Sequence, residues 1–187
     1  MKLFHTLLLA TMLTLQPAVA ATYVIDASHT YPVFEIDHLG FSIQRGQFDE
    51  ISGIIEVDET AQTGRVDVSI NVASLDSGHA QRDEILTGTE WFDAARHPQM
   101  TYRSSRLVFT SNRLSQVEGE LTLRGITRPV KLDIVRYKCG LNLAARKRGC
   151  GADAVATLKR SEFGMTKGLP FVGDEVRLLI QIEAYAQ

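Results

Sequence analysis

The chain has 187 residues, with 20 Lys and Arg side chains against 22 Asp and Glu, and a formal net charge of −2. Nucleic-acid-binding domains usually carry a basic surplus, so this balance argues against a nucleic-acid partner. The length suits one domain with a sizeable hydrophobic core.

The first 21 residues have the features of an export signal. Lys2 supplies a positive charge, Leu3 to Leu15 form an apolar run, and Ala18-Val19-Ala20 is the pattern of small residues that signal peptidase accepts. A retained membrane anchor is the weaker alternative, because a span needs about 20 apolar residues. We expect cleavage directly after this pattern or one residue later. Residues 22–187 should then work in the periplasm without stable membrane insertion.

Beyond the signal, apolar and polar residues alternate with the period of two that is typical of β-strands. In chain order, this pattern predicts strands over 33–38, 53–58, 66–72, 100–104, 107–110, 117–123, 130–135, 154–158 and 176–182. Residues suited to tight turns separate many of these runs, at Thr63-Gly64, Ser111-Asn112, Arg124-Gly125 and Val172-Gly173-Asp174. Strands joined so closely should pair antiparallel.

A single segment favours helix, from His79 to Leu86, with Ser77 or Gly78 as its cap and Thr87-Gly88 at its end. A second short turn is expected over 90–95. About eight strands with one helical excursion predict an all-β domain over 22–187, a closed antiparallel barrel that leaves no exposed edge. A barrel of this size is either filled by side chains or holds one small ligand.

The two cysteines, Cys139 and Cys150, are an even count in an exported chain, which favours a disulfide. Such a bond would stabilise the fold by about 3 kcal/mol on the loop-entropy estimate. A metal site at the cysteines lacks neighbouring ligands. His29, His79 and His97 are too widely spaced to form a ligand pattern, so no metal and no other cofactor are expected.

Short motifs in a fixed order cover nearly all of the chain after the signal. They are Tyr23–Asp26, Phe34–Gly40, Gly46–Phe48, Ser74–Gly78, Arg82–Leu86, Trp91–Asp93, His97-Pro98, Gly119–Val130 and Arg160–Met165. In this order and spacing the chain resembles the YceI-like polyisoprenoid-binding proteins. The resemblance implies a lipocalin-like barrel around a long isoprenoid or similar amphiphile, in a periplasmic or secreted protein proposed to carry or store lipids such as quinones. Pro32 departs from the pattern and predicts an irregular or edge position in the first strand.

The resemblance implies that an apolar tail contacts inward-facing side chains of the barrel. We predict twelve: Phe34, Ile36, Phe48, Ile55, Val68, Ile70, Met100, Tyr102, Leu121, Phe163, Met165 and Ile180. The alternative is that they simply fill a dry core. For the head group at the mouth we predict His38, Trp91 and Phe92. His38 could instead be a satisfied buried histidine, and the two aromatic residues could cap the barrel as ordinary packing.

The resulting hypothesis is a periplasmic carrier or sequestering protein for a polyisoprenoid or other long-chain lipid, working by burial and not by catalysis. The alternative is an envelope stress-related or structural protein that holds a fatty acid or fatty amide incidentally. A hydrolase triad of Ser161, His79 and Asp83 is disfavoured, because no G-x-S-x-G nucleophile elbow is present. A homodimer through an exposed edge or face stays open. So does the role of the basic run Arg146–Arg148, either a lipid contact or a solvated loop.

Overall fold

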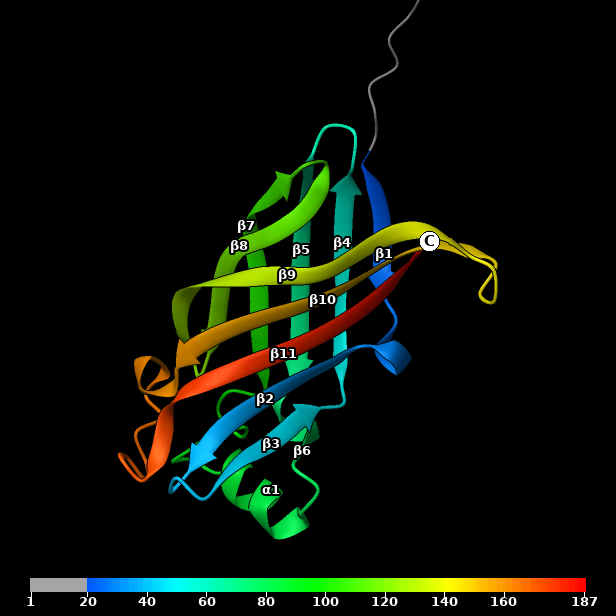
Figure 1. Ribbon diagram of the computed structural model, residues 1–187. Coiled ribbons are helices and arrows are strands. Elements are labelled where there is room, and N and C mark those ends of the chain that lie inside the picture. Colours follow the sequence, from blue (N-terminus) through cyan, green and yellow to red (C-terminus); the bar gives the residue numbers. More distant parts are fainter. Residues whose placement is uncertain (1–19) are drawn as a thin grey trace, which may run out of the picture.

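The computed structural model describes residues 20–187, and the predicted signal segment lies almost entirely outside them. Strands dominate (Figure 1), and their bounds are β1 Ala21–Ile25, β2 Tyr31–His38, β3 Ser42–Phe48, β4 Ile51–Asp58, β5 Thr63–Asn71, β6 Leu75–Asp76, β7 Gln99–Thr110, β8 Arg113–Leu123, β9 Ile126–Asn142, β10 Lys147–Lys159 and β11 Val172–Ala186. One α-helix, α1 Ala80–Thr87, and three short 3-10 helices, η1 Ala27–His29, η2 Val72–Ser74 and η3 Arg160–Phe163, complete this part of the chain.

Eight strands close into an antiparallel barrel, which confirms the predicted fold class. Going around the ring, the order is β1, β4, β5, β7, β8, β9, β10 and β11, and β11 pairs with β1 to close it. Most neighbours are sequential hairpins, as in β7–β8–β9–β10–β11. Closure uses up the backbone donors and acceptors that an open sheet would expose at its edges.

The barrel wall is complete only at one end, because the first strand breaks between β1 and β2. The backbone N–H of Asp26 and the hydroxyl of Thr30 both donate to the carbonyl oxygen of Glu183, at 2.9 and 3.2 Å, which holds the break against β11. Beyond it, β2 still pairs with β11 but pairs with β3 on its other side. Pro32 faces Ile180 of β11, and pairing with β3 starts one residue later, so Pro32 lies at a local edge.

The turn chemistry was predicted correctly at two hairpins. Ser111 and Asn112 join β7 to β8, and Arg124-Gly125 join β8 to β9, all with positive φ. At two other sites the turn falls a few residues earlier, because Thr63 already begins β5 and Val172 already begins β11.

Helix α1 starts one residue later than predicted. Its cap is His79, whose side chain accepts from the N–H of Arg82, whereas Ser77 or Gly78 had been expected. Gly88 follows the last turn as predicted. In the described part of the chain, no helix is both long and apolar enough to cross a membrane.

Strands β9 and β10 extend well beyond the barrel as a hairpin (Figure 1). The alternating pattern predicted only their inner portions, 130–135 and 154–158. In the outer portion Cys139 and Cys150 are direct register partners and form the predicted disulfide. The exposed tip carries Leu141 and Leu143 together with the basic run Arg146–Arg148.

Candidate functional site

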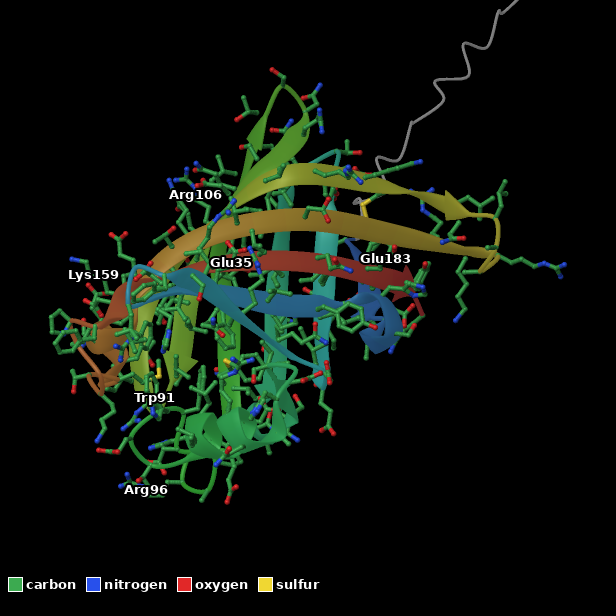
Figure 2. All side chains as sticks on the ribbon, turned by 60° about the horizontal axis from the view of Figure 1, so that its bottom comes forward. Glu35, Trp91, Arg96, Arg106, Lys159 and Glu183 are labelled. Carbon is green, nitrogen blue, oxygen red and sulfur yellow. A yellow bond between two sulfur atoms is a disulfide. The ribbon has the colours of Figure 1, made fainter. Side chains whose placement is uncertain are left out.

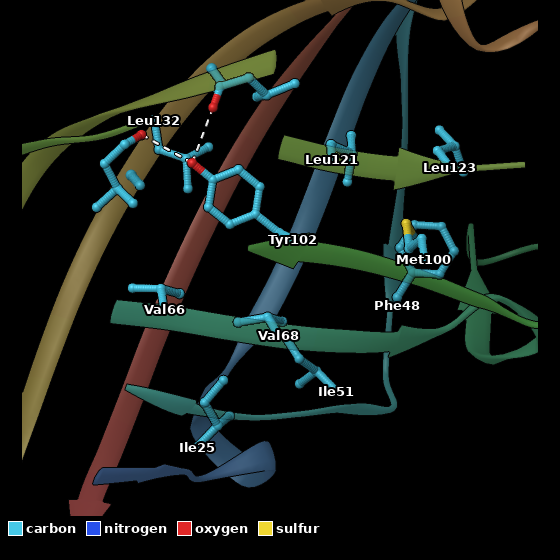
Figure 3. Close-up of a cluster of buried hydrophobic side chains, with 14 of the residues drawn as sticks. Ile25, Phe48, Ile51, Val66, Val68, Met100, Tyr102, Leu121, Leu123 and Leu132 are labelled. Atoms are coloured by element: carbon cyan, nitrogen blue, oxygen red, sulfur yellow. Dashed lines mark hydrogen bonds between the residues drawn. The ribbon is translucent and has the colours of Figure 1, made fainter. Parts of the chain in front are cut away.

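The barrel encloses a cavity of about 300 Å³, toward the end that carries α1. This volume lies at the lower end of the range for small-molecule sites, roughly 300–1,000 Å³. Most of its wall is made of apolar side chains from the strands, and Figure 3 shows several of them. They are Pro32, Val33, Phe34, Ile36, Phe48, Ile51, Val66, Val68, Ile70, Met100, Tyr102, Leu121, Leu123, Val130, Leu132, Leu158, Val172, Val176, Leu178, Ile180 and Ile182.

Ten of the twelve residues predicted for the apolar tail line this cavity. They are Phe34, Ile36, Phe48, Val68, Ile70, Met100, Tyr102, Leu121, Met165 and Ile180. Ile55 does not, because it faces Tyr23 of β1 at the closed end of the barrel. Phe163 does not either: it is fully buried in η3 and lies beside a separate hollow between β9 and β10.

Three phenylalanines pack together on one side of the cavity. The ring of Phe48 lies edge-on to that of Phe92, with 5.4 Å between centroids, and Phe34 lies 6.0 Å from each. Gly46 of β3 makes room for this cluster, since a Cβ there would lie 2.5 Å from Cζ of Phe34. The cluster joins β2 and β3 to the segment that follows α1, across the gap where the barrel wall opens.

Helix α1 covers part of that gap and is tied down by the pair Arg82 and Asp83. The Arg82 guanidinium donates to Oγ of Ser77 at 2.8 Å and to Oε1 of Gln44 on β3 at 2.6 Å. The Asp83 carboxylate accepts from the N–H of Ser77 at 2.8 Å and from its hydroxyl. Both residues thus tie the helix to the neighbouring segment, and Arg82 in addition lines the cavity.

The rest of the cover is a run of turns over residues 88–98, where Trp91 and Phe92 both reach the cavity wall. Arg124 holds this run by donating to the carbonyl oxygens of Thr89 and Trp91. Figure 2 shows Trp91 on the barrel side of the segment and Arg96 on its outer side. Both aromatic residues predicted for the mouth therefore lie on the cavity wall.

Asp93 is a buried carboxylate within the same run of turns. Its Oδ2 lies 2.5 Å from Nη2 of Arg96 and 4.0 Å from Nε2 of His97. The ion pair with Arg96, with added attraction from His97 and Arg124, holds the pKa of Asp93 below its ordinary value. The carboxylate is thus charged at neutral pH, and its two buried oxygens accept no hydrogen bond from the described residues.

Arg160 of η3 is a site residue that the sequence reasoning missed. It is 1% exposed, and its guanidinium donates to the carbonyl oxygens of Met165, Gly173 and Val172 at 2.6 to 2.9 Å. The guanidinium also lies 5.1 Å from the centroid of the Trp91 ring, a cation–π distance. Burial lowers the pKa of Arg160, while nearby Asp174 raises it. The sequence feature that could have pointed to Arg160 is the motif Arg160–Met165, in which it is the first residue.

The polar residues of the cavity wall gather near α1, and among the described lining residues none is acidic. They include His38, Gln44, Arg45, Arg82 and Arg160. His38 lies at the exposed end of β2, so the alternative of a buried histidine is wrong, and its side chain lines the cavity where it opens. Exposed lining residues, His38, Arg45 and Ile85, mark where the cavity meets solvent.

The opposite end of the barrel is filled by side chains. Tyr102 lies between the two regions, and its hydroxyl is 3.0 Å from the carbonyl oxygens of both Val117 and Val130, so one proton is shared between them (Figure 3). Burial, with a smaller contribution from Glu118, raises the pKa of Tyr102. The phenol therefore stays protonated and anchors the floor of the cavity.

The residues considered for a hydrolase triad are not brought together. The Ser161 hydroxyl donates to Oδ2 of Asp174 at 2.8 Å, and Asp83 is occupied by Ser77. Within residues 20–187, no group of three or more His, Cys, Asp or Glu side chains is placed to hold a metal ion.

Comparison with known proteins places the chain in a family. The model of the YceI-like domain matches residues 23–184. Protein YceI of Salmonella arizonae is 35% identical over 179 residues, which cover 94% of this chain and 93% of that protein. A UPF0312 protein of Pectobacterium carotovorum is 35% identical over 173 residues, covering 91% and 89%.

Two solved structures share the fold. BcnA of Burkholderia cenocepacia superposes with a TM-score of 0.73 at 25% identity, covering 85% of this chain and 98% of BcnA. A polyisoprenoid binding domain from Saccharophagus degradans, implicated in plant cell wall breakdown, superposes with a TM-score of 0.64 at 16% identity, covering 89% and 99%. With a matching barrel and a domain match over most of its length, this chain belongs to the YceI-like family.

Proposed function

We propose that the chain binds a polyisoprenoid or similar long-chain amphiphilic lipid inside its barrel, with the tail in the cavity and the head group near α1. The observation that carries the proposal is the division of the cavity wall. Its depth is lined by aliphatic and aromatic side chains, and its polar residues gather at the mouth. An amphiphile with a long apolar tail matches this division. The domain from Saccharophagus degradans, which has the same fold, is described as polyisoprenoid binding, and this supports the same class of ligand.

The driving force is burial. Each CH₂-sized unit moved from water into the cavity contributes about 0.8 kcal/mol. Association and ordering of a flexible tail offset much of this gain, so the affinity should lie well below the sum over the chain. No group in this scheme makes or breaks a covalent bond, and we propose a binding protein and not an enzyme.

The place of action follows from the amino-terminal segment. We propose that residues 1–21 direct export and that the protein carries or sequesters its lipid in the periplasm. Ala21 already pairs with Val57 in the barrel, so cleavage after Ala20 would keep the whole of β1. A barrel that hides an apolar tail would let such a lipid cross an aqueous compartment.

Native mass spectrometry of the protein purified from its own cells tests the proposal, followed by organic extraction of the bound material. We expect one prenyl or similar long-chain lipid per chain, exchangeable with added lipid. Trp91, the single tryptophan, lies on the cavity wall, so its fluorescence should report the exchange. A protein that is empty and also fails to bind added prenyl lipids would contradict the proposal. A bound fatty acid or fatty amide that prenyl lipids cannot displace would favour the incidental-ligand alternative.

A further inference from the structure

Four large apolar side chains are exposed together at the mouth of the cavity. They are Leu39 and Ile43, each 47% exposed, Phe171, 69% exposed, and Phe41, 90% exposed, and we call them the apolar rim. Single exposed apolar residues are common on protein surfaces, but neighbouring ones around an opening mark an interaction site.

The apolar rim comes from two turns that are joined to each other and from the start of β3, where Ile43 lies. The N–H of Leu39, after β2, donates to the carbonyl oxygen of Phe171, before β11, at 2.8 Å. The next residues inward, His38 and Val172, are register partners and both line the cavity. The apolar rim is therefore continuous with the cavity wall. Figure 1 shows both turns at the end of the barrel that carries α1.

We propose that the apolar rim docks on the surface of a phospholipid bilayer, so that a lipid passes between the membrane and the cavity without crossing water. The inference rests on the proposed function, because a long-chain isoprenoid dissolves only in a membrane or in such a cavity. Aromatic and aliphatic side chains at a bilayer interface gain free energy by entering the boundary between head groups and acyl chains.

The shape of the apolar rim favours a bilayer over a second copy of the chain. Leu39, Phe41 and Phe171 lie in turns and Ile43 lies at the start of β3, so the patch is small: it buries little area against another folded surface but can enter between head groups. A stable protein interface needs roughly 800 Å² from each partner, and four side chains supply much less. A second copy seated there would also close the mouth through which the lipid must pass.

The charge of the cavity wall agrees with a phospholipid surface, although one exposed carboxylate, that of Asp37, lies beside the rim and accepts from the N–H of Gly40. The ionisable side chains at the exposed edge of the cavity, His38 and Arg45, are basic, as are Arg82 and Arg160 further in. Arg45 is paired with Glu35 at 2.7 Å, so electrostatic attraction is a minor part of the docking. We therefore expect binding that persists at high salt, as for an apolar contact.

The far end of the molecule offers a matched control. Leu141 and Leu143, at the tip of the β9–β10 hairpin, are 64% and 79% exposed, as exposed as the apolar rim, but lie away from the cavity (Figure 1). The test compares the double variant Phe41→Ser/Phe171→Ser with Leu141→Ser/Leu143→Ser. All four side chains are exposed and none lines the cavity, so both variants should fold.

The measurement is flotation of the full mature chain with vesicles of phosphatidylethanolamine and phosphatidylglycerol at high salt. We expect the rim variant to float about tenfold less than the wild type, and the hairpin variant to float like the wild type. Equal flotation of the rim variant and the wild type would overturn the proposal. So would a wild-type protein that stays unbound and forms a dimer lost in the rim variant.

A second readout separates this inference from the proposed function. Water-dispersed prenyl alcohol is added without vesicles, and Trp91 fluorescence measures occupancy of the cavity directly. Unchanged binding in the rim variant, with slower loading from vesicles, supports docking as a separate step. Vesicle binding by a protein that takes up no prenyl lipid would support the docking surface and contradict the proposed cargo.

Discussion

The two ends of the barrel are built from the same strands but differ in what they enclose. At the closed end β1 pairs with both β4 and β11, the ring of eight strands is complete, and side chains such as Val57 and Leu107 fill it. At the other end the chain continues from β1 into β2, which pairs with β3. This leaves a gap in the wall that α1 and residues 88–98 cover.

This difference shows where the cavity comes from. A ring of eight strands can be filled by side chains or hold one small ligand, and at the closed end it is filled. The break around η1 lets β2 and β3 move away from β4, and the space gained is enclosed by a helix and turns that contribute Arg82, Trp91 and Phe92 to the wall. Stability should therefore depend most on the closed end, and ligand binding on the covered end.

The sharpest test of this division is to add the same bulk to a valine at each end. Val68 and Val57 are both 5% exposed, but only Val68 lines the cavity. Val57→Phe should overpack the filled end and lower the free energy of unfolding by about 3 kcal/mol. Val68→Phe should place its ring in the cavity, leave that free energy within about 1 kcal/mol, and weaken lipid binding by roughly tenfold or more.

Denaturant unfolding and titration with a prenyl lipid measure the two effects. Equal destabilisation by the two substitutions would show that the covered end is packed as densely as the closed one, and the division between the ends would fail.

A smaller effect is expected from a glycine beside Tyr102, at the boundary between the two ends. A Cβ on Gly119 of β8 would lie 2.5 Å from the carbonyl oxygen of Arg103 and 2.7 Å from Cζ and the hydroxyl of Tyr102. Gly119→Ala should therefore displace the Tyr102 ring and lower the free energy of unfolding by about 2 kcal/mol. Thermal unfolding measures this loss.

Gly140 of β9 is the matched control, because an added Cβ there meets nothing within 4 Å. Gly140→Ala should change the free energy of unfolding by no more than about 0.5 kcal/mol. If the two substitutions proved equally mild, Tyr102 would not be held as tightly against β8 as the structure indicates.

Much of the closed end could be predicted from the sequence because its signals are local. Alternation such as Ile55, Glu56 and Val57 fixes which face of a strand turns inward, and Ser111-Asn112 marks a hairpin wherever it occurs. The disulfide followed from an even cysteine count in a chain with an export signal and no neighbouring metal ligands.

The covered end was harder to predict because its geometry depends on contacts distant in sequence. Strand β3 has weak alternation, and its Gly46 is explained only by the Phe34 ring packed on it. His38 is in phase with Phe34 and Ile36 but is exposed, because periodicity cannot show where a strand leaves the barrel. Arg160 could not be recognised as buried, since its three acceptors are backbone carbonyl groups.

The smallest effect concerns the cover itself, through the Asp93 carboxylate. Its pKa in the folded chain is below the ordinary value of 3.8, mainly because of the ion pair with Arg96. Its contribution to stability is therefore fully present at neutral pH, and it is lost as the pH falls from about that ordinary value through the lower folded one. The effect should be modest, because the Arg96 side chain is 69% exposed and solvent screens the pair.

Trp91, two residues before Asp93 and the single tryptophan of the chain, should report the change. In the wild type its fluorescence should shift with acid as the turns over 88–98 loosen, before the closed end unfolds. Asp93→Asn removes the titrating group, so the variant should show a looser cover already at neutral pH and no separate acid step.

The same acid profile in wild type and variant would show that another group loosens the cover. His97, 4.0 Å from Asp93, would be the next to test, by His97→Gln. A profile in which cover and barrel unfold together would show that the two ends form one cooperative unit, with the ion pair too weak to separate them.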